Sequence, residues 1–185
     1  QSLRLKARRS YEPKKGRFKY PFFSELERRV DRGAPVPSYD TVVLNSGGSI
    51  YGSTHIIDPV ITRLAREAGY PYASPVRSAA VFINGVYYGH SWLMARQDEA
   101  FLKSLFGMPA DDFEVLEGGE HKVYTKNPLH RYEFWKLHRH ARDDMNDEEV
   151  FKAFSDEVDV ENLLYYMAIQ LYTANEDWPR SNVRI

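Results

Sequence analysis

The amino-acid sequence predicts an α+β fold, with a strand- and hairpin-rich N-terminal part and a helical C-terminal part. Segments with the two-residue period of strands lie mainly before residue 90, and most segments with helical periodicity and acidic caps lie after residue 97. The two kinds of segment do not alternate as they would in a parallel βαβ fold. The 185 residues fit a single domain, with a strand-rich lobe over about 1–97 and a helical lobe over about 98–185.

Three segments carry strand patterns. Residues 2–8 alternate apolar and charged side chains, which is the period of a half-exposed strand. Residues 41–44 form an uncharged, β-branched run that predicts a buried strand leading into a polar, glycine-containing loop. Residues 80–88 place two apolar runs around Asn84-Gly85, the two-residue signal for a hairpin with a type I′ turn, because Asn and Gly tolerate positive φ angles.

Capping residues predict two helices in the middle of the chain. A helix over 59–68 has Asp58 as its N-cap, Pro59 at the first helical position and Gly69 as its stop. A shorter helix opens at Asp98 and ends at a glycine nine residues later. Both helices therefore have local start and stop signals.

Two further helices are predicted to begin at Asp147 and Asp159. The second has apolar side chains at helical spacing, which predicts a stripe facing the core. This stripe consists of Val160, Leu163, Leu164, Met167, Ala168 and Leu171. A helical pattern upstream contains three histidines, which we expect at the surface or in packing contacts and not around a metal ion. They are His130, His138 and His140.

Charge is distributed unevenly although the chain is nearly neutral, with 25 basic and 26 acidic residues. Residues 1–30 contain ten basic and three acidic residues, whereas residues 143–161 contain one basic and nine acidic residues. Two solvated faces of opposite sign explain this pattern, and a basic lobe that attracts phosphate is the alternative. A nucleic-acid-binding function is disfavoured because the whole chain is not basic and contains no known reader motif.

Composition excludes several further classes of protein. No apolar run approaches the roughly 18 residues that cross a bilayer, so no membrane span is expected. The absence of cysteine excludes disulfides, thiolate zinc sites and cysteine nucleophiles. Oligomeric state has no signature in the sequence.

A polar segment follows the last predicted helix and leads into residues 183–185, which have the pattern of a strand start. Asp177 and Asn182 stand five positions apart in this segment, the spacing of a protein-kinase catalytic loop. In such a loop the Asp orients the attacking hydroxyl group, and the Asn amide oxygen ligates a Mg²⁺ ion that neutralises phosphate charge. The alternative is that both side chains shape a turn around Pro179.

Other kinase motifs are missing or weak. There is no G-x-G-x-x-G loop, V-A-I-K strand or D-F-G segment, although Gly47 and Gly48 belong to a glycine-rich loop that could approach a phosphate. Glu67 could act as the helical glutamate of kinases, and a solvent-facing glutamate near a helix end is the simpler account.

Several segments together resemble the CotH kinase family, the spore-coat-H-like secreted protein kinases. They occur in the order of the family and span essentially the whole chain. They are Ser2-Leu3-Arg4-Leu5, Lys19-Tyr20-Pro21-Phe22-Phe23, Leu44-Asn45-Ser46-Gly47, residues 81–89 with their Asn-Gly turn, residues 159–166, and Asn175-Glu176-Asp177-Trp178-Pro179 with Asn182.

The resemblance implies an atypical protein-kinase-like fold that uses ATP with Mg²⁺ or Mn²⁺. The implied reaction transfers the γ-phosphoryl group to serine or threonine of a protein substrate, in an exported, cell-surface or spore-coat setting. Asp177 matches the catalytic aspartate and Asn182 the metal-side asparagine, while Asn175 and Trp178 shape the loop. The second metal carboxylate and the nucleotide lysine of the family fall outside the matching segments, as in a domain cut at both ends, and neither Lys14 nor Lys15 is assigned to nucleotide binding.

This sequence departs from the family pattern at three positions. Ala95 replaces a usual Glu, Ser49 replaces an Asp, and Ile57 replaces an Arg. The loss of two carboxylates and one guanidinium group threatens nucleotide affinity more than the catalytic loop. A catalytically degenerate pseudokinase that serves as a surface or coat-assembly binding module is therefore the alternative function.

Overall fold

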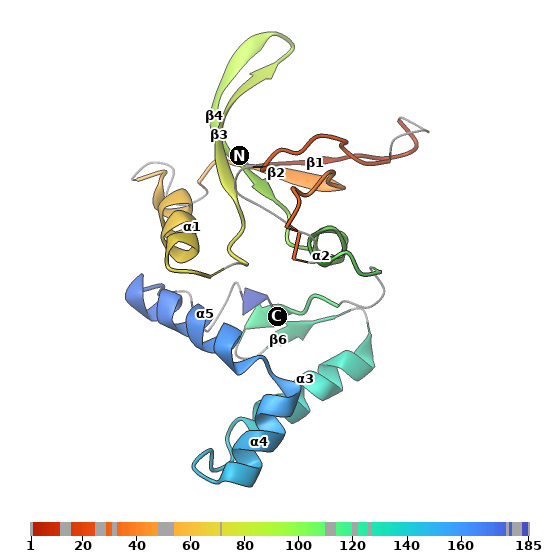
Figure 1. The fold of residues 1–185 in the computed structure, drawn as a ribbon. Coiled ribbons are helices and arrows are strands. Elements are labelled where there is room, and N and C mark those ends of the chain that lie inside the picture. The colour runs from red at the N-terminus through yellow and green to blue at the C-terminus, as the bar shows by residue number, and fades with distance from the viewer. Residues whose placement is uncertain are drawn as a thin grey trace. The chain divides into compact units, whose positions relative to one another are not determined.

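The structure is a computed structural model of the whole chain. The chain divides into two compact units, Gln1–Phe113 and Glu114–Ile185, and each is described by itself (Figure 1). The division of one kinase-like domain into lobes near residue 97 remains a prediction. The described residues are 2–11, 16–24, 29–30, 33–47, 54–70, 72–109, 114–119, 122–125, 127–176, 178 and 183–184.

The first unit contains a four-stranded antiparallel sheet in the order β1-β2-β4-β3. Its strands are β1 (Leu3–Lys6), β2 (Thr41–Asn45), β3 (Val76–Ile83) and β4 (Val86–Ala95). The predicted hairpin is confirmed, because Asn84 and Gly85 connect β3 to β4 with φ angles of 51° and 80°. Two consecutive positive φ values are the requirement of a type I′ turn.

One face of this sheet packs on the helix α2 (Glu99–Phe106) and on aromatic residues that precede β2. Asp98 caps α2 by accepting a hydrogen bond from the backbone N of Phe101 at 3.1 Å, and Gly107 ends the helix at a φ of 74°. Both caps agree with the sequence prediction. The buried core is formed by Phe23, Val36, Tyr39, Val42, Ala95, Phe101 and Leu105.

Helix α1 (Ile57–Glu67) begins two residues before the predicted start. Ile56 occupies the N-cap position and Asp58 lies in the first turn, so the prediction that Asp58 caps this helix was wrong. The Asp58 carboxylate instead accepts a hydrogen bond from the Asn45 side chain. Gly69 follows the helix end with a φ of 96°, which agrees with the predicted stop.

The second unit combines a small antiparallel sheet with three helices among its described residues. The sheet has the order β6-β5-β7, with β5 (Glu117–Gly119), β6 (Lys122–Tyr124) and β7 (Val183–Arg184). The helices are α3 (Pro128–His140), α4 (Glu148–Glu157) and α5 (Val160–Tyr172). The predicted caps Asp147 and Asp159 both accept hydrogen bonds from backbone amides of the first helical turn. The α+β prediction is therefore confirmed.

The apolar stripe of α5 is not part of a core, contrary to the prediction. No residue of α5 is buried, and Leu164 and Leu171 are 59% and 68% exposed. The periodicity identifies a face that gains stability when it is covered, but another element must supply the cover. Helices α3 and α4 of this unit pack against each other. In the part of the chain that the structure describes, no helix is long and apolar enough to cross a membrane.

Candidate functional site

The candidate catalytic segment leaves the C-terminal end of α5. The helix ends where Thr173 donates its hydroxyl to the carbonyl oxygen of Ile169 at 2.8 Å. Ala174 then takes a φ of 48°, which turns the chain out of the helix. The backbone N of Asn175 closes this turn by donating to the carbonyl oxygen of Gln170 at 3.1 Å. A left-handed residue followed by a hydrogen bond back to the last helical turn is a common way to end a helix.

Asn175 and Trp178 both contact the helix from which the segment departs. The Asn175 amide donates to Oε1 of Gln170 at 2.6 Å, and the backbone N of Trp178 donates to the Asn175 carbonyl oxygen at 3.3 Å. The Trp178 ring meets Tyr166 edge to face, with 6.2 Å between ring centroids. Burial raises the pKa of Tyr166 above its ordinary value. These contacts attach Asn175 and Trp178 to α5.

Asp177 and Asn182 lie outside the described residues. The elements on either side of them are described: α5 ends before the segment, and β7 follows Asn182 directly. In β7, Val183 pairs with Gly118 and Arg184 with Glu117 of β5. The predicted helix before the segment and strand after it are therefore confirmed, while the roles of Asp177 and Asn182 stay predictions.

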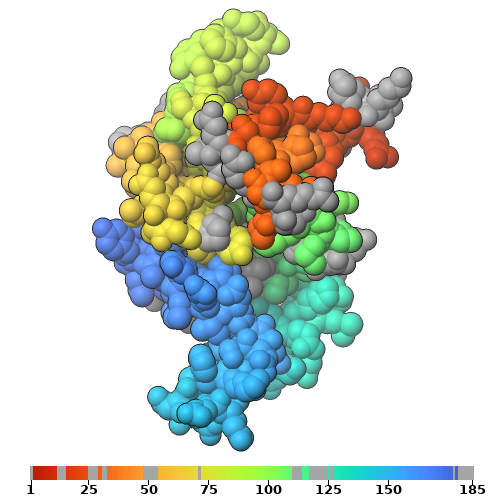
Figure 2. All heavy atoms as spheres, viewed as in Figure 1, coloured from red at the N-terminus to blue at the C-terminus, as the bar shows by residue number. Residues whose placement is uncertain are grey.

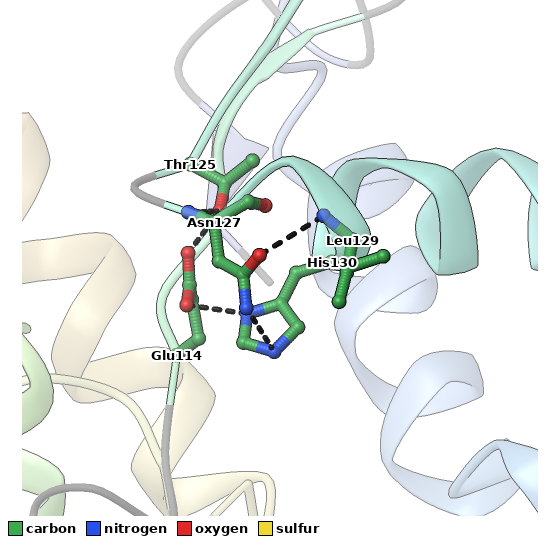
Figure 3. A network of polar contacts seen from close by, with 5 residues as sticks. All are labelled: Glu114, Thr125, Asn127, Leu129 and His130. Carbon is green, nitrogen blue, oxygen red and sulfur yellow. Dashed lines mark hydrogen bonds and ion pairs between the residues drawn. The ribbon is translucent and has the colours of Figure 1, made fainter.

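A network of polar contacts fixes the junction between β5, β6 and α3 (Figure 3). The two carboxylate oxygens of Glu114 accept hydrogen bonds from the Thr125 hydroxyl and from Nδ1 of His130. The Asn127 Oδ1 caps α3 by accepting from the backbone N of Leu129 at 3.0 Å, and its Nδ2 faces Nε2 of His130 at 3.3 Å. Because β5 also pairs with β7, this network supports the strand on which the candidate segment ends. No local sequence pattern predicts this network, because Glu114 and His130 are 16 residues apart.

A second candidate region lies in the first unit, where β2 runs into the glycine-rich loop. Asn45 donates its amide to Oδ2 of Asp58 at 2.8 Å, and its Oδ1 accepts from the backbone N of Gly47 at 2.9 Å. Gly47 has a φ of 85°, a conformation in which other residues are strained. Gly48 lies outside the described residues. Asn45 therefore connects α1 to the start of this loop, a role that the sequence analysis did not assign.

The remaining nucleotide candidate, Glu67, lies at the C-terminal end of α1. Its Oε1 accepts a hydrogen bond from Nε of Arg63 at 2.8 Å, and both side chains are exposed. The hydrogen bond with Glu67 raises the pKa of Arg63. Exposed pairs of this kind stabilise a helix only slightly, so Glu67 has an ordinary structural partner and its nucleotide role stays a prediction.

The described residues contain no group of three or more His, Asp or Glu side chains that could hold a metal ion. The metal ligand expected in this protein, Asn182, lies outside the described residues. An Asn amide oxygen and an Asp carboxylate are nevertheless oxygen donors of the kind that Mg²⁺ prefers, so the donor chemistry of the segment fits the ion.

Comparison with known proteins decides the family. The family model described as CotH kinase protein matches residues 1–185. The chain belongs to the CotH kinase family. Among curated proteins and solved structures, none matches this CotH-family chain. The family predicted from the ordered segments is therefore confirmed over the full length of the chain.

The structure gives a context to two of the three departures from the CotH pattern. Ala95 is only 5% exposed and belongs to the hydrophobic core beside Val42, its neighbour across the sheet. Ile57 is the first residue of α1, and its side chain is exposed. Ser49 lies outside the described residues. At position 95, the CotH-family chain has a buried methyl group where the family pattern has a carboxylate.

Proposed function

We propose that this CotH-family chain is an atypical protein kinase that transfers the γ-phosphoryl group of ATP to serine or threonine of a protein substrate. The observation that carries the proposal is the family match over the whole chain, which includes the segment between α5 and β7. A kinase-like fold and an exported, cell-surface or spore-coat location belong to the same proposal.

In this proposal Asp177 orients the substrate hydroxyl group and accepts its proton as the new bond to phosphorus forms. Asn182 contributes its amide oxygen to Mg²⁺ or Mn²⁺, which supplies positive charge next to the phosphates when bound. Asn175 and Trp178 hold the segment on α5. In the proposal this positions the Asp177 carboxylate before the reaction begins, so that no conformational entropy is lost in ordering it at the transition state. Positioning and electrostatic stabilisation account for most of the rate of phosphoryl transfer.

The nucleotide site of this proposal includes the loop that begins at Gly47. Backbone amides of a glycine-rich loop can approach phosphate oxygens closely because no side chain intervenes. Asn45 supports the start of this loop, since its Oδ1 accepts a hydrogen bond from the backbone N of Gly47 and its Nδ2 donates one to the Asp58 carboxylate. Gly48 and Glu67 are the weaker candidates for the same site.

A catalytically degenerate binding module is the second candidate function, and Ala95 is the observation that favours it. A buried alanine in the core cannot pair with a lysine as the usual glutamate of the family could. A pseudokinase on this fold would bind a coat or surface protein whether or not Asp177 is intact.

Thermal unfolding of the natural full-length protein, with and without ATP and a divalent cation, distinguishes these two functions by whether the nucleotide binds. We expect Mg²⁺-dependent stabilisation that EDTA abolishes, amounting to about 2.7 kcal/mol at 100 times the dissociation constant. The variant Asp177→Ala should keep most of this stabilisation, because the proposed role of Asp177 is on the hydroxyl group. The absence of any nucleotide-dependent shift in folded protein would contradict the kinase proposal and favour the binding module.

A further inference from the structure

The hairpin of β3 and β4 extends beyond the sheet of the first unit. Among the described residues, β2 pairs with β4 only from Trp92 to Ala95, so residues 79–91 have strand partners only within the hairpin. In Figure 1 this ribbon, drawn in yellow-green, projects past β1 and β2. In Figure 2 the same atoms form a projection whose tip is uncovered by the other described segments of this unit on the visible face.

The projecting ribbon is apolar and largely exposed, apart from the buried Val81 and Ser91, and it has no acidic or basic residue other than His90. Five of its large side chains are exposed by 44% to 71% of their area, namely Phe82, Ile83, Val86, Tyr87 and Tyr88. From Ser78 to Trp92 the sequence contains no Asp, Glu, Lys or Arg. An isolated two-stranded ribbon is marginally stable in water, and exposed strand edges are usually protected by charged residues. This ribbon therefore has the composition of a surface that another strand covers.

The two edges of the ribbon differ. On β4, a register shift leaves Tyr88 without a partner opposite it, and the next residue, Gly89, has a φ of 144°. Such a bulge interrupts the regular edge and disfavours further pairing. β3 has no extra residue and is the outermost strand of the sheet. The edge of β3 is thus the one that remains suitable for pairing.

The turn determines which backbone groups of β3 point away from β4. A two-residue turn makes Ile83 and Val86 the first hydrogen-bonded pair, so Phe82 and Ala80 direct their N–H and C=O groups outward. Among the described residues, no backbone hydrogen bond from another element reaches residues 79–83. Within the described part of the chain, these groups are therefore available to a fifth strand.

We propose that β3 pairs with β3 of a second copy of this chain, in antiparallel orientation about a twofold axis at Val81. In this register Ala80 lies opposite Phe82 of the partner subunit, and Ala79 opposite Ile83 of the partner subunit. Each large side chain then faces a small one, and both outward-directed residues meet outward-directed partners. The absence of charge means that the twofold axis brings no like charges together, so the strand is complementary to itself.

The area on the pairing strand suits a weak, reversible dimer. Phe82 and Ile83 are the exposed large apolar side chains of β3, and each presents roughly 100 Å², since a whole aromatic side chain buries 150–250 Å². Two copies therefore cover about 400 Å² of side chain besides the paired backbone, which is below the size of a standard interface and in the range of transient contacts. A lipid surface fits the ribbon less well, because an open strand edge has no hydrogen-bond partners within hydrocarbon. The dimer should accordingly dissociate on dilution.

Sedimentation of the full-length protein over a range of concentrations tests this proposal with a matched pair of variants. Phe82 on β3 and Tyr87 on β4 are 61% and 58% exposed, and their rings contact each other at a centroid distance of 5.4 Å. Phe82→Lys and Tyr87→Lys therefore remove the same aromatic pair, but only the first places a charge on the pairing edge. We expect the wild type to dimerise, Phe82→Lys to weaken the dimer by at least tenfold, and Tyr87→Lys to weaken it much less.

Introduced cysteines test the register, because the chain has no cysteine of its own. Val81→Cys places two thiols next to each other across the twofold axis, at a separation that suits a disulfide. Val86→Cys on β4 is the control. Mild oxidation should give a reducible dimer with the first variant and not with the second. A monomer at all concentrations, equal weakening by the two lysine variants, or binding to phosphatidylcholine vesicles that both variants abolish equally would overturn the proposal.

Discussion

Replacement of Trp178 by alanine tests whether the candidate segment is held on α5 by the contacts described above. The indole ring packs edge to face on Tyr166, and the Trp178 backbone N bonds to Asn175. A partly buried tryptophan hides roughly 150 Å² of apolar area, so its truncation should lower the free energy of unfolding by about 3 kcal/mol. The aromatic pair contributes about 1 kcal/mol of this loss. Urea unfolding measures the change.

The same substitution should alter the titration of Tyr166. Burial raises the pKa of this phenol, so the folded state disfavours its ionised form, and the resulting stability is present below the ordinary tyrosine pKa and lost as pH rises through the folded value. Trp178→Ala exposes the ring and should bring its pKa down toward about 10. The ultraviolet absorbance change that Tyr166→Phe removes identifies this group among the 13 tyrosines.

Activity separates a positioning role from simple packing. If Trp178 positions Asp177, Trp178→Ala should lower kcat by about tenfold to a hundredfold in protein that is still folded. Trp135 in α3 is the matched control, since its ring packs on His138 at 5.3 Å, and its ring contacts among the described residues are with α3 alone. Trp135→Ala should cost stability and leave kcat nearly unchanged. Equal kcat values for the two variants, or an unchanged Tyr166 titration in Trp178→Ala, would refute the reasoning.

Three further substitutions have definite expected outcomes. Asp98→Ala removes the N-cap of α2 and should lower stability by about 1 kcal/mol in urea unfolding, whereas Asp98→Asn should retain most of it. Ala95→Glu restores the family residue inside the core. We expect it to lower the free energy of unfolding by about 3 kcal/mol or more, because the carboxylate would be buried without a partner. A neutral effect would show that the family carboxylate has a partner here. Asn45→Ala leaves Asp58 and the Gly47 amide without their bonds and should cost about 1–3 kcal/mol. Its KM for ATP should rise with little change in kcat, and an unchanged KM would exclude this loop from the nucleotide site.

Features that depend on neighbouring residues were predicted from the sequence. Asn84-Gly85 has the positive φ values that its turn requires, and Asp98, Asp147 and Asp159 cap the helices that they were expected to cap. Each signal is local, because a cap or a tight turn is stabilised within a few residues of itself.

Features that depend on distant partners were not predicted. Asp58 has the side chain of a typical N-cap residue, but its carboxylate accepts a hydrogen bond from Asn45 of strand β2 instead. The strand β5 contains two glycines and exists through its pairing with β6 and β7, so it has no hydrophobic period. In α5 the helical spacing of the apolar residues is clear, but this spacing does not reveal whether another element covers them.

The candidate site likewise has some features that the sequence predicts and others that depend on residues distant in the chain. The spacing of Asp177 and Asn182 and the order of segments led to the CotH family, which the whole-chain match confirms. The contacts of Asn45 and of the pair Glu114 and His130 are made between residues distant in sequence, so only the fold reveals them.

Phosphoryl transfer by the full-length protein tests the kinase account most directly. The assay measures label transferred from γ-labelled ATP to a library of serine- and threonine-containing peptides, with Mg²⁺ or with EDTA. Asp177→Asn is compared with Asp143→Asn, an exposed aspartate in the turn after α3 that undergoes the same chemical change away from the candidate segment. The account predicts metal-dependent transfer that Asp177→Asn lowers by about 10²–10⁴-fold and Asp143→Asn leaves unchanged. Transfer at the wild-type rate by Asp177→Asn would contradict it.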